Sequence, residues 1–573
     1  MGGEKAQRVL CLAQMSGAKA LVEALKREKV EVVFGMPGGA NLPIYDAMFD
    51  SGIRHILVRH EQSAGHMADG FARAARRAGV CMGTSGPGAT NLVTAIGTAF
   101  ADSSPVVAIT GQVPKHMIGR DAFQETDIVG IITPITKYCF QPREAADIPA
   151  VIRKSFYLAE TGRPGPVLVD VPKDVQTTSA DMVFPDSVTV RGYSPHVEPD
   201  PALVERATDL LLNAERPMIM SGGGVIIAGA FHELQALAEA LICPVVTTFK
   251  GKGGFPEQHP LSLGPIGMHG HAEANKLVIE SDVLLAAGAR FSDRSVGRFD
   301  DFGKDGMKII HVDIDPSEIG KNKPADIALV ADVKITLRRL VEAVLRRQVA
   351  RNNEMVWMKH VEEVKNEFRN RPRKEEREIT PYKMLKALRE VLPPEGITTT
   401  EVGQCQMWAS LFFDVIQPGT FFSSTGLGTM GFGFPAAIGA KVARPDVPVV
   451  DIAGDGGFNM TENSLAVSVV DKIPVIVALM NNDSLGMVAQ WQRLFYDRRL
   501  IGVKMHGVPD YVKVAEAYGA QGVHVASIEE FKKAVKLGLS SEVATVIDVP
   551  IHPEEDVFPF VVPGTALKDM IIA

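Results

Sequence analysis

The chain has 573 residues, 46% of them hydrophobic and 22% charged, and it carries a formal net charge of −8 at pH 7. It is too long for one hydrophobic core, and its length suggests about three or four domains. The acidic balance argues against a nucleic-acid or anionic-membrane partner. No apolar run approaches the roughly 18 residues of a membrane span.

Cysteine usage indicates a reducing compartment. The five cysteines, Cys11, Cys81, Cys139, Cys243 and Cys405, are scattered and form no CxxC pair. This spacing is typical neither of a disulfide framework nor of a zinc site. The first residues lack the basic and apolar regions of a secretory signal, so we expect a cytoplasmic protein.

The first segment alternates helix and strand. Apolar patterning predicts a helix over 17–29 and strands over 30–34, 80–84, 106–110 and 167–171. Two glycine turns, PGG at 37–39 and SGPGATN at 85–91, follow strands. Such turns are commonly tight connections between a strand and a helix, so each alone is weak evidence for a functional site. Glu61 stands where a strand over 56–58 gives way to a helix. Such a residue is usually a solvated carboxylate in a favourable helix dipole; a functional role needs a partner that benefits from a carboxylate held away from water.

The middle segment has the same alternation, with a helix over 202–213 and strands over 218–220, 245–248, 283–287 and 308–314. Glycines and acids follow these strands, a pattern that suits a nucleotide in a doubly wound sheet. His269 and His271 are metal ligands by type. Because no third ligand is near them in the sequence, contact with a cofactor or surface placement is favoured.

The third segment contains the most informative stretch. We expect a strand over 448–453, a sharp turn GDGG at 454–457, a helix that Thr461 and Asn463 cap and that extends through 470, and a strand over 475–480. This is a βαβ unit, whose right-handed crossover makes its strands parallel. A further strand over 544–549 closes the segment.

Asp455 and Asn482 follow the two strands of this unit and should meet at one carboxyl edge of the sheet, where α/β proteins bind ligands. A carboxylate and an amide oxygen suit Mg²⁺, which proteins commonly hold together with substrate phosphates. The glycines and the helix start beside them suit a diphosphate. An ordinary turn with an exposed aspartate is the alternative, but the separation of one helix and one strand favours a Mg²⁺–diphosphate site.

Two neighbouring motifs are ambiguous. GLGTMG at 426–431 matches GxGxxG, yet Asp451 lies inside its strand rather than at the end, so we favour a close-approach loop before a helix with Pro435 near its first turn. Met487 and Trp491 share a helix face. Such a pair is usually core packing, but its start beside the proposed metal site favours a substrate wall.

The three segments predict an α/β protein with three doubly wound parallel-sheet domains. A proline-rich polar stretch separates the first two segments, and a highly charged stretch with apolar residues at helical spacing, read as a surface helix leading into a linker, separates the last two. We expect domains at 1–190, 191–345 and 381–573, with a charged linker at 346–380.

Together these motifs resemble the thiamine-diphosphate enzymes, and among them the acetohydroxyacid synthase (acetolactate synthase) catalytic subunits. GDG followed by NN is typical of the whole cofactor superfamily. The resemblance covers nearly the whole chain, and its more specific motifs are DAFQET at 121–126, PKDVQ at 172–176, GMHG at 267–270 and NNDSLGMVAQW at 481–491. It implies, in chain order, a pyrimidine-binding domain, an FAD-binding domain and a diphosphate- and Mg²⁺-binding domain.

The resemblance also implies roles for individual residues. Glu61 would hydrogen-bond the pyrimidine of the cofactor, which is the partner that a functional role of this carboxylate needs. The reaction centre would include Gly38, Gly39, Gln124, Lys173 and Gln404. Thiamine diphosphate would contact Gly428, Met430, Gly454, Gly456, Gly457 and Met487, and Mg²⁺ would be held by Asp455, Asn482 and Ser484. Substrate would meet Phe123, Arg294 and Trp491. FAD would be held by Arg163, Gly222, Gly223, Gly224, Met268, His269, Gly288, Arg290, Asp313, Ile314, Asp332 and Val333.

The implied reaction decarboxylates pyruvate on thiamine diphosphate and joins the two-carbon unit to a second pyruvate or to 2-ketobutyrate. The products are 2-acetolactate or 2-aceto-2-hydroxybutyrate, in the first common step of branched-chain amino acid biosynthesis. Arg294 would read the acceptor carboxylate, and Trp491 would set the size of its side chain. The resemblance further implies a homodimer or homotetramer with active sites shared between subunits, and a separate regulatory small subunit.

Three alternatives stay open at this point: a pyruvate oxidase-type flavin oxidoreductase, a glyoxylate carboligase-like enzyme and a catalytically silent paralogue. The second is disfavoured because that family lacks the glutamate present here as Glu61. The chain departs from the synthase pattern at Cys405, where a histidine is usual, and at Lys115-His116, where an arginine pair is common. Both departures leave acceptor preference open.

Overall fold

A computed structural model describes residues 13–195, 197–304, 306–347, 354–369 and 377–572. The chain divides into two compact units, Met1–Ser194 and Pro195–Ala573. They contain three six-stranded sheets, one in the first unit and two in the second, and every strand pair within these sheets is parallel. The predicted α/β class with three parallel sheets is confirmed.

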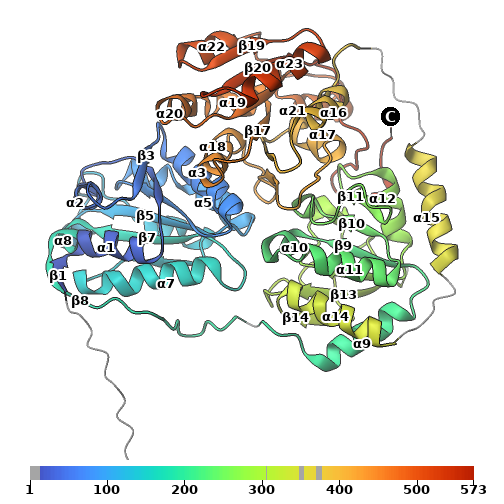
Figure 1. Cartoon of the computed structure of the whole chain (residues 1–573), viewed down its shortest axis with the longest axis horizontal. Helices are drawn as coiled ribbons and strands as arrows, with labels where there is room; N and C mark the ends of the chain where they lie inside the picture. Colours follow the sequence, from blue (N-terminus) through green and yellow to red (C-terminus); the bar gives the residue numbers. More distant parts are fainter. Residues whose placement is uncertain (1–12, 196, 305, 348–353, 370–376, 573) are drawn as a thin grey trace, which may run out of the picture. The chain divides into compact units, whose positions relative to one another are not determined.

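The first unit is built on a sheet of order β3-β2-β4-β5-β7-β6, and a short antiparallel pair, β1 and β8, lies beside it. Helices α1 and α7 lie on one side of the sheet, and α3 and α5 lie on the other (Figure 1). The elements are β1 (Ala13–Ser16), α1 (Gly17–Arg27), β2 (Val32–Gly35), α2 (Leu42–Met48), β3 (Arg54–Leu57), α3 (Glu61–Ala75), β4 (Gly79–Gly83), α4 (Pro87–Thr90), α5 (Val93–Ala101), β5 (Val106–Gln112), α6 (Ile128–Ile132), β6 (Tyr138–Phe140), α7 (Ile148–Glu160), β7 (Val167–Pro172), α8 (Lys173–Thr177) and β8 (Ser179–Met182).

The second unit begins with the sheet β11-β10-β9-β12-β13-β14. Its elements are α9 (Pro201–Leu212), β9 (Pro217–Ser221), α10 (Gly223–Ala228), α11 (Phe231–Leu241), β10 (Val245–Thr247), β11 (Ser262–Pro265), α12 (Ala272–Glu280), β12 (Val283–Ala287), α13 (Asp293–Val296), β13 (Lys308–Asp313), β14 (Ile327–Val330), α14 (Val333–Arg347) and α15 (Glu354–Arg369). The near-continuous apolar character of these strands follows from burial on both faces.

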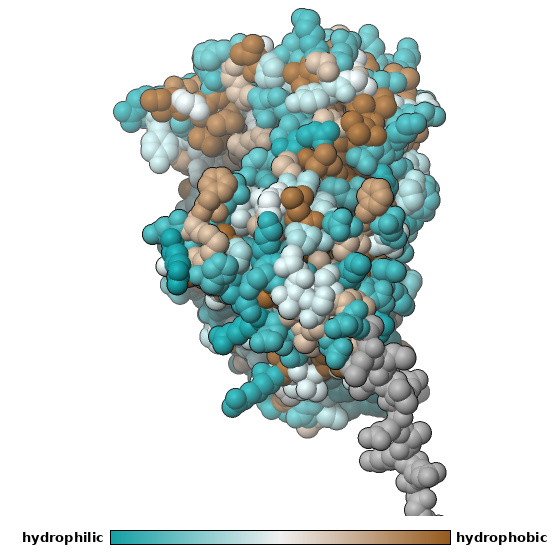
Figure 2. Space-filling view, turned by 90° about the vertical axis from the view of Figure 1, so that its left-hand side faces the viewer, coloured by the Kyte–Doolittle hydropathy of each residue, from teal (hydrophilic) through white to brown (hydrophobic). Residues whose placement is uncertain are grey.

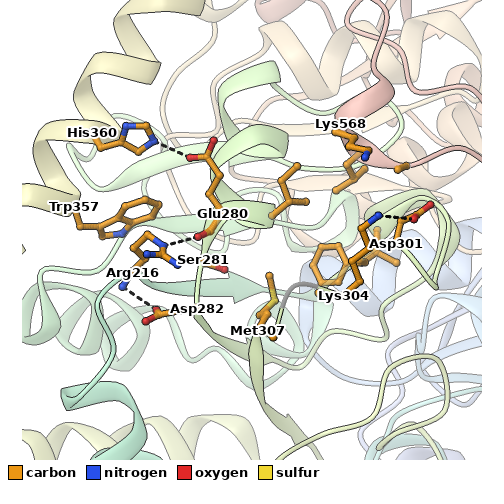
Figure 3. A pocket seen from close by; sticks show the side chains of 17 residues that line it. Arg216, Glu280, Ser281, Asp282, Asp301, Lys304, Met307, Trp357, His360 and Lys568 are labelled. Atoms are coloured by element: carbon orange, nitrogen blue, oxygen red, sulfur yellow. Dashed lines mark hydrogen bonds and ion pairs between the residues drawn. The ribbon is translucent and has the colours of Figure 1, made fainter.

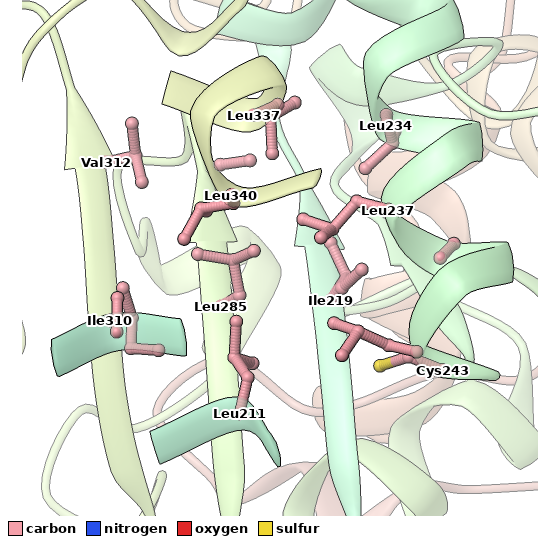
Figure 4. Close-up of a cluster of buried hydrophobic side chains, with 14 of the residues drawn as sticks. Leu211, Ile219, Leu234, Leu237, Cys243, Leu285, Ile310, Val312, Leu337 and Leu340 are labelled. Carbon is pink, nitrogen blue, oxygen red and sulfur yellow. The ribbon is translucent and has the colours of Figure 1, made fainter. Parts of the chain in front are cut away.

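One face of this middle sheet packs against α9, α11 and α14. Leu285 of β12 is fully buried and lies among Ile219, Leu237 and Leu340, which come from the neighbouring strand β9 and from two of these helices (Figure 4). The other face packs against α12 and α15. The sheet is therefore covered on both sides and leaves its strand ends as the place for a ligand.

Replacing Leu285 by alanine should lower the free energy of unfolding of this core by about 3–5 kcal/mol, because it removes a buried side chain and leaves a cavity. Hydrogen exchange of the β9, β12 and β13 amides under native conditions measures the loss. The matched control is Leu345→Ala on α14, where the side chain is 61% exposed and the expected change is below about 0.5 kcal/mol. Equal protection in both variants would contradict the packing.

The remainder of the second unit forms the sheet β16-β15-β17-β18-β20-β19. Its elements are α16 (Pro381–Val391), β15 (Ile397–Thr400), α17 (Gln404–Phe412), β16 (Phe421–Ser423), α18 (Gly433–Ala443), β17 (Val449–Gly454), α19 (Asp455–Asn459), α20 (Leu465–Val470), β18 (Ile476–Asn481), α21 (Gly486–Phe495), α22 (Tyr511–Ala517), β19 (Gln521–His524), α23 (Ile528–Leu539) and β20 (Thr545–Pro550). The predicted βαβ unit is present, with β17 and β18 parallel neighbours.

The crossover of this unit differs from the prediction. A short helix, α19, already begins at Asp455, and a 3-10 turn over Glu462–Ser464 separates it from α20. Thr461 does not cap a helix with its side chain. Its hydroxyl donates instead to the carbonyl of Gly431, at 3.3 Å, because the loop that contains Gly431 lies against the turn.

The stretch predicted as a charged linker contains secondary structure. Helix α14 extends to Arg347, and α15 has an amphipathic pattern with Trp357, Val361 and Val364 buried in the core of the middle sheet. The prediction of a solvated helix was incomplete because those apolar residues find a partner surface. The proposed linker residues 348–353 and 370–376 lie outside the described residues.

Two smaller points complete the fold. Among the described residues Cys81, Cys139, Cys243 and Cys405 are free thiols, as their spacing predicted, and Cys11 lies outside the described part. None of the helices in the described ranges combines the length and the apolar character needed to cross a membrane.

Candidate active site

Glu61 is the first residue of α3 and points into the interior of the first unit, where it is only 6% exposed. The side-chain amide of Asn91 donates to its Oε2 at 2.9 Å. Burial together with the charge of Glu61 raises the pKa of the nearby Tyr45 hydroxyl. The alternative of a solvated carboxylate at a helix start does not apply here, because Glu61 is buried, as a functional carboxylate held away from water would be.

The glycine turns of the first unit meet Glu61 through Thr84, at the carboxyl edge of the sheet. The hydroxyl of Thr84 accepts from the amide of Ala40, at 3.3 Å, and a Cβ on Gly38 would lie 2.5 Å from the Thr84 side chain. A Cβ on Gly88 would lie 3.2 Å from Glu61 Oε1. Gly39 faces open space. Only glycine at positions 38 and 88 allows these loops to pack this closely.

Two further predicted residues border the same edge. Gln124 adopts a left-handed backbone conformation, with φ of 60°, and packs against Gly86, where a Cβ would lie 3.0 Å from the Gln124 side chain. Lys173 is exposed at the start of α8, directly after β7. Phe123 is 88% exposed. Gln124 and Lys173 thus lie at the same edge of the sheet, and Phe123 is directed to the surface.

Arg163 does not join this group. It lies in the loop before β7, and its Nε donates to Ser103 Oγ at 2.8 Å. Ser103 precedes β5, so both residues lie at the amino edge of the sheet, opposite Glu61. Within the first unit Arg163 is thus separated from the predicted reaction centre.

The predicted metal residues come together in the second unit. Asp455 is 3% exposed at the end of β17; its Oδ1 accepts from the amide of Gly456 at 2.8 Å, and its Oδ2 accepts from the amide of Ser484 at 3.1 Å. Burial raises the pKa of Asp455 to about 6, against the effect of these amides. A buried carboxylate of this kind is the group that a bound divalent cation would stabilise in its ionised form.

Asn482 and Gln404 are linked beside Asp455. The Nδ2 of Asn482 donates to Gln404 Oε1 at 3.0 Å, and the Nε2 of Gln404 donates to Gln490 Oε1 at 3.0 Å. Asn482, Gln404 and Gln490 are all buried. These bonds leave the amide oxygen of Asn482 as the group available to a cation, because its nitrogen is already used.

The loop with GLGTMG reaches the GDGG turn. Gly428 has φ of 71°, and a Cβ on Gly456 would lie 3.3 Å from the terminal methyl of Met430. Gly454 ends β17, and Gly457 lies inside α19. Both expectations for this motif hold: it is a loop, and α18 starts after it with Pro435 in its first turn.

Met487 and Trp491 lie on α21, the helix that follows the proposed metal residues. Met487 packs against the core of the third sheet, which supports the packing interpretation for that residue. Trp491 is half-buried, and its indole nitrogen has no hydrogen-bond partner among the described residues.

In the middle sheet the predicted glycines form a tight backbone contact at the ends of β9 and β12. The amide of Gly224 donates to the carbonyl of Gly288 at 3.0 Å, and a Cβ on Gly224 would lie 2.7 Å from the Gly288 Cα. Gly222 and Gly223 precede or begin α10. Larger residues would push these two turns apart and close the space above the strand ends.

Met268 and His269, which follow β11, lie against Arg294 of α13, which follows β12. The amide of Met268 donates to the carbonyl of Arg294 at 2.8 Å, and the guanidinium of Arg294 is 2.7 Å from the Met268 sulfur. His269 is buried and stacks on Phe560 with ring centroids 5.2 Å apart. Burial, followed by the charge of Arg294, lowers the pKa of His269 to about 3. This histidine is neutral at physiological pH and is not a phosphate-binding cation.

The remaining predicted FAD residues lie at the carboxyl ends of β12, β13 and β14. Asp313 accepts from the amide of Asp315 at 2.9 Å, and Asp332 accepts from the amide of Ile335 at 3.0 Å, at the start of α14. Asp332 therefore also has a structural role at the helix start. The others on these strand ends are Arg290, Ile314 and Val333.

A pocket of about 570 Å³ lies elsewhere, at the amino edge of the middle sheet (Figure 3). Arg216, Asp282 and Met307, which line it, directly precede β9, β12 and β13. Polar side chains that line it contact one another: His360 Nε2 lies 2.7 Å from Glu280, and Lys304 lies 3.3 Å from Asp301. Since ligands of open α/β sheets bind at the carboxyl edge, this pocket is not the candidate active site.

The sequence did not single out four polar residues of these sites, of which Asn91 is half-buried and the other three are buried. Asn91 ends the SGPGATN motif, so a signal for it existed, whereas Glu401 follows β15 without any motif. Ser221 and Thr247 end β9 and β10, and their hydroxyls are buried without a partner among the described residues. A single serine or threonine at a strand end gives no signal in the sequence.

Three family models match the chain in order. They are described as the thiamine pyrophosphate enzyme N-terminal TPP binding domain, matching residues 15–131, the central domain, matching 204–340, and the C-terminal TPP binding domain, matching 401–549. With three parallel sheets and polar groups gathered at their carboxyl edges, these matches define a thiamine pyrophosphate-dependent enzyme.

Curated relatives narrow the class. The chain is 48% identical to the probable acetolactate synthase large subunit of Methanocaldococcus jannaschii over 97% of its own length and 95% of the relative's. It is 44% identical to the acetolactate synthase large subunit of Corynebacterium glutamicum over 97% and 90%, and 41% identical to that of Cyanidium caldarium over 97% and 96%. The chain belongs to the acetolactate synthase large-subunit family.

Proposed function

We propose that this chain decarboxylates pyruvate and ligates the two-carbon unit to a second pyruvate or to 2-ketobutyrate, giving 2-acetolactate or 2-aceto-2-hydroxybutyrate in branched-chain amino acid biosynthesis. The observation that carries the proposal is that two carboxylates are buried at the carboxyl edges of parallel sheets. The side chain of Asn91 donates to Glu61, and the amide of Ser484 donates to Asp455. Membership of the acetolactate synthase family supports the reaction.

Bound thiamine diphosphate would supply a carbon nucleophile and an electron sink for decarboxylation. Glu61, oriented by Asn91, would exchange a proton with the pyrimidine of the cofactor. Met430 and Gly428 would hold the ring system, and Gly454, Gly456 and Gly457 would give the diphosphate close access to backbone amides. Gly38, Gly39, Gln124, Lys173 and Gln404 would line the reaction centre.

Mg²⁺ would bind Asp455, the amide oxygen of Asn482 and the carbonyl of Ser484. The donor set fits, because carboxylate, amide and carbonyl oxygens are the ligands that Mg²⁺ prefers. The contact between Asp455 Oδ2 and the Ser484 amide, at 3.1 Å, brings the two loops into the same place. The cation would anchor the diphosphate there.

FAD would bind at the carboxyl edge of the middle sheet. The residues fit a nucleotide there: glycines 222–224 and 288 leave space, and the buried hydroxyls of Ser221 and Thr247 have no partner among the residues described. Such hydroxyls are costly unless a ligand or water bonds them. Arg163 of the first unit is the remaining residue of the proposed set.

Arg294 would bind the acceptor carboxylate, since its side chain is 51% exposed and its guanidinium is fixed at one end by Met268. Trp491 would form the wall that limits the acceptor side chain, and Phe123 would cover the substrate from its exposed loop.

Oligomerisation is part of the proposal. We expect a homodimer or homotetramer with shared active sites, a separate regulatory small subunit, and a cytoplasmic location. On the face drawn in Figure 2, brown hydrophobic groups are exposed between hydrophilic ones. Phe49 and Phe123 of the first unit are each 88% exposed. The relatives are named large subunits, which supports a small subunit.

The test is an assay of acetoin, formed by acid treatment of the product from pyruvate, with and without thiamine diphosphate, Mg²⁺ and FAD. We expect product only when thiamine diphosphate and Mg²⁺ are both present. If pyruvate instead bleached bound flavin stoichiometrically and no acetolactate formed, the enzyme would be an oxidoreductase. A folded chain that binds the cofactors but gives no product would be a silent paralogue.

A further inference from the structure

A buried carboxyl group without an assigned role lies between the two cofactor loops of the third sheet. Glu401 follows β15, is fully buried, and is held to β17 by a hydrogen bond from its own amide to the Ile452 carbonyl at 3.1 Å. Its Oε2 accepts from the amide of Gly431 at 2.7 Å, and its Oε1 accepts from the amide of Phe434 at 3.2 Å. The first donor ends GLGTMG and the second lies in the first turn of α18.

The same carboxylate touches the other loop. A Cβ on Gly457 would lie 2.7 Å from Glu401 Oε2, so the diphosphate turn packs directly on this oxygen. Gly431, whose amide donates to Glu401, also accepts with its carbonyl from the hydroxyl of Thr461. Met430 precedes that peptide, and its terminal methyl approaches Gly456. One side chain therefore fixes the distance between the Met430 loop and the GDGG turn.

A second buried carboxyl group, Asp451, lies on the neighbouring strand β17. It accepts from Thr399 Oγ1 at 2.9 Å, and its Oδ2 has no partner among the described residues. Burial raises the pKa of Glu401 to about 7, against several backbone amides, and burial together with Glu401 raises the pKa of Asp451 well above its usual range. Two neighbouring carboxyl groups in one buried site do not both ionise readily, because burial and their mutual repulsion disfavour the second charge.

The hydrogen bonds decide which group keeps the charge. Glu401 faces amides at the start of α18, where the helix dipole favours an anion. Asp451 has a single donor and one oxygen without a partner. Glu401 is therefore the first of the two to ionise, and Asp451 keeps its proton.

We propose that Glu401 is a positioning residue for thiamine diphosphate, because its carboxylate clamps the Met430–Gly431 peptide against the Gly456–Gly457 turn. This inference rests on the proposed contacts of those two loops with the cofactor. It assigns Glu401 no contact with substrate or cofactor: its effect passes through the loops, which it holds in the spacing that the bound cofactor requires.

The test uses the full-length protein with Mg²⁺ and compares Glu401→Gln with Asp451→Asn. Glutamine keeps the shape but turns a donor toward one of the two amides, so thiamine diphosphate should bind about 10- to 100-fold more weakly. At saturating cofactor kcat should return to within about threefold of wild type, which a general loss of structure would not allow. Asparagine replaces a group that is already neutral, so cofactor affinity should change less than about threefold.

The outcomes separate the inference from the proposed function. Failure of the wild type to bind thiamine diphosphate would overturn both, whereas unchanged affinity in Glu401→Gln would overturn only the positioning role. If Glu401→Gln does not fold, Thr461→Val decides, since it removes the hydrogen bond to the carbonyl of Gly431, the other bond that ties this residue to the turn, with little change of shape. A rise of about two- to fivefold in the cofactor dissociation constant at unchanged kcat supports the clamp, and no rise refutes it.

Discussion

Replacing Glu61 by glutamine is expected to reduce kcat for acetolactate formation by about 10²- to 10⁴-fold, the range typical for loss of a positioned acid–base group. The change is nearly isosteric, and Asn91 can still donate to the remaining side-chain oxygen. Thiamine diphosphate affinity should therefore change much less than turnover. Initial rates and equilibrium binding of the cofactor, measured on the same preparation, distinguish the two effects.

The control for this variant is Glu23→Gln on α1, where the carboxylate is paired with Arg27 at the surface. Its activity should equal that of the wild type, because exposed ion pairs contribute little to stability. Undiminished acetolactate output from Glu61→Gln would show that another group is the base. The burial of Glu61 at the start of α3 would then have no catalytic explanation.

The second large effect is expected for Asp455→Ala, which should abolish Mg²⁺-dependent retention of thiamine diphosphate. The substitution removes the only ionised ligand proposed for the cation, and it also frees the amides of Gly456 and Ser484. We expect the cofactor dissociation constant in saturating Mg²⁺ to rise by at least about 100-fold, since losing a charged, hydrogen-bonded partner costs several kcal/mol.

Equilibrium dialysis of thiamine diphosphate with and without Mg²⁺ gives this measurement. Asp446→Asn is the matched control: it changes an exposed aspartate, paired with Arg444, shortly before the same strand. That variant should bind the cofactor as the wild type does. Full retention of thiamine diphosphate by Asp455→Ala would place the metal elsewhere.

Asp451 shows how the fold overrides a motif. GLGTMG followed by an acidic residue matches the sequence pattern of dinucleotide-binding proteins. In the structure the acid lies inside β17 and hydrogen-bonds Thr399, and the glycines form a loop against the GDGG turn. A carboxyl in the middle of a strand cannot reach a ribose at the strand end. The motif here forms a loop that packs against the GDGG turn.

The positions of the strands along the chain can be predicted from the sequence, because the apolar pattern of a buried strand is local. The strand over 283–287 was predicted with the bounds that β12 has, and the strand over 167–171 is one residue shorter than β7. Buried parallel strands are continuous apolar runs bounded by turns, which a single sequence displays. The helix between β17 and β18 was harder, because Thr461 uses its hydroxyl for a tertiary bond to Gly431 instead of a cap.

The sequence by itself determined the three alternating segments, the turn GDGG with its distant asparagine, and hence the edge at which Asp455 and Asn482 meet. Only the tertiary structure decided that Glu61 is buried rather than solvated, that α15 packs on the middle sheet, and that Glu401 joins two loops. The reason is physical: periodicity reports which side of an element is apolar, whereas the burial of one carboxylate depends on donors that come from distant parts of the chain.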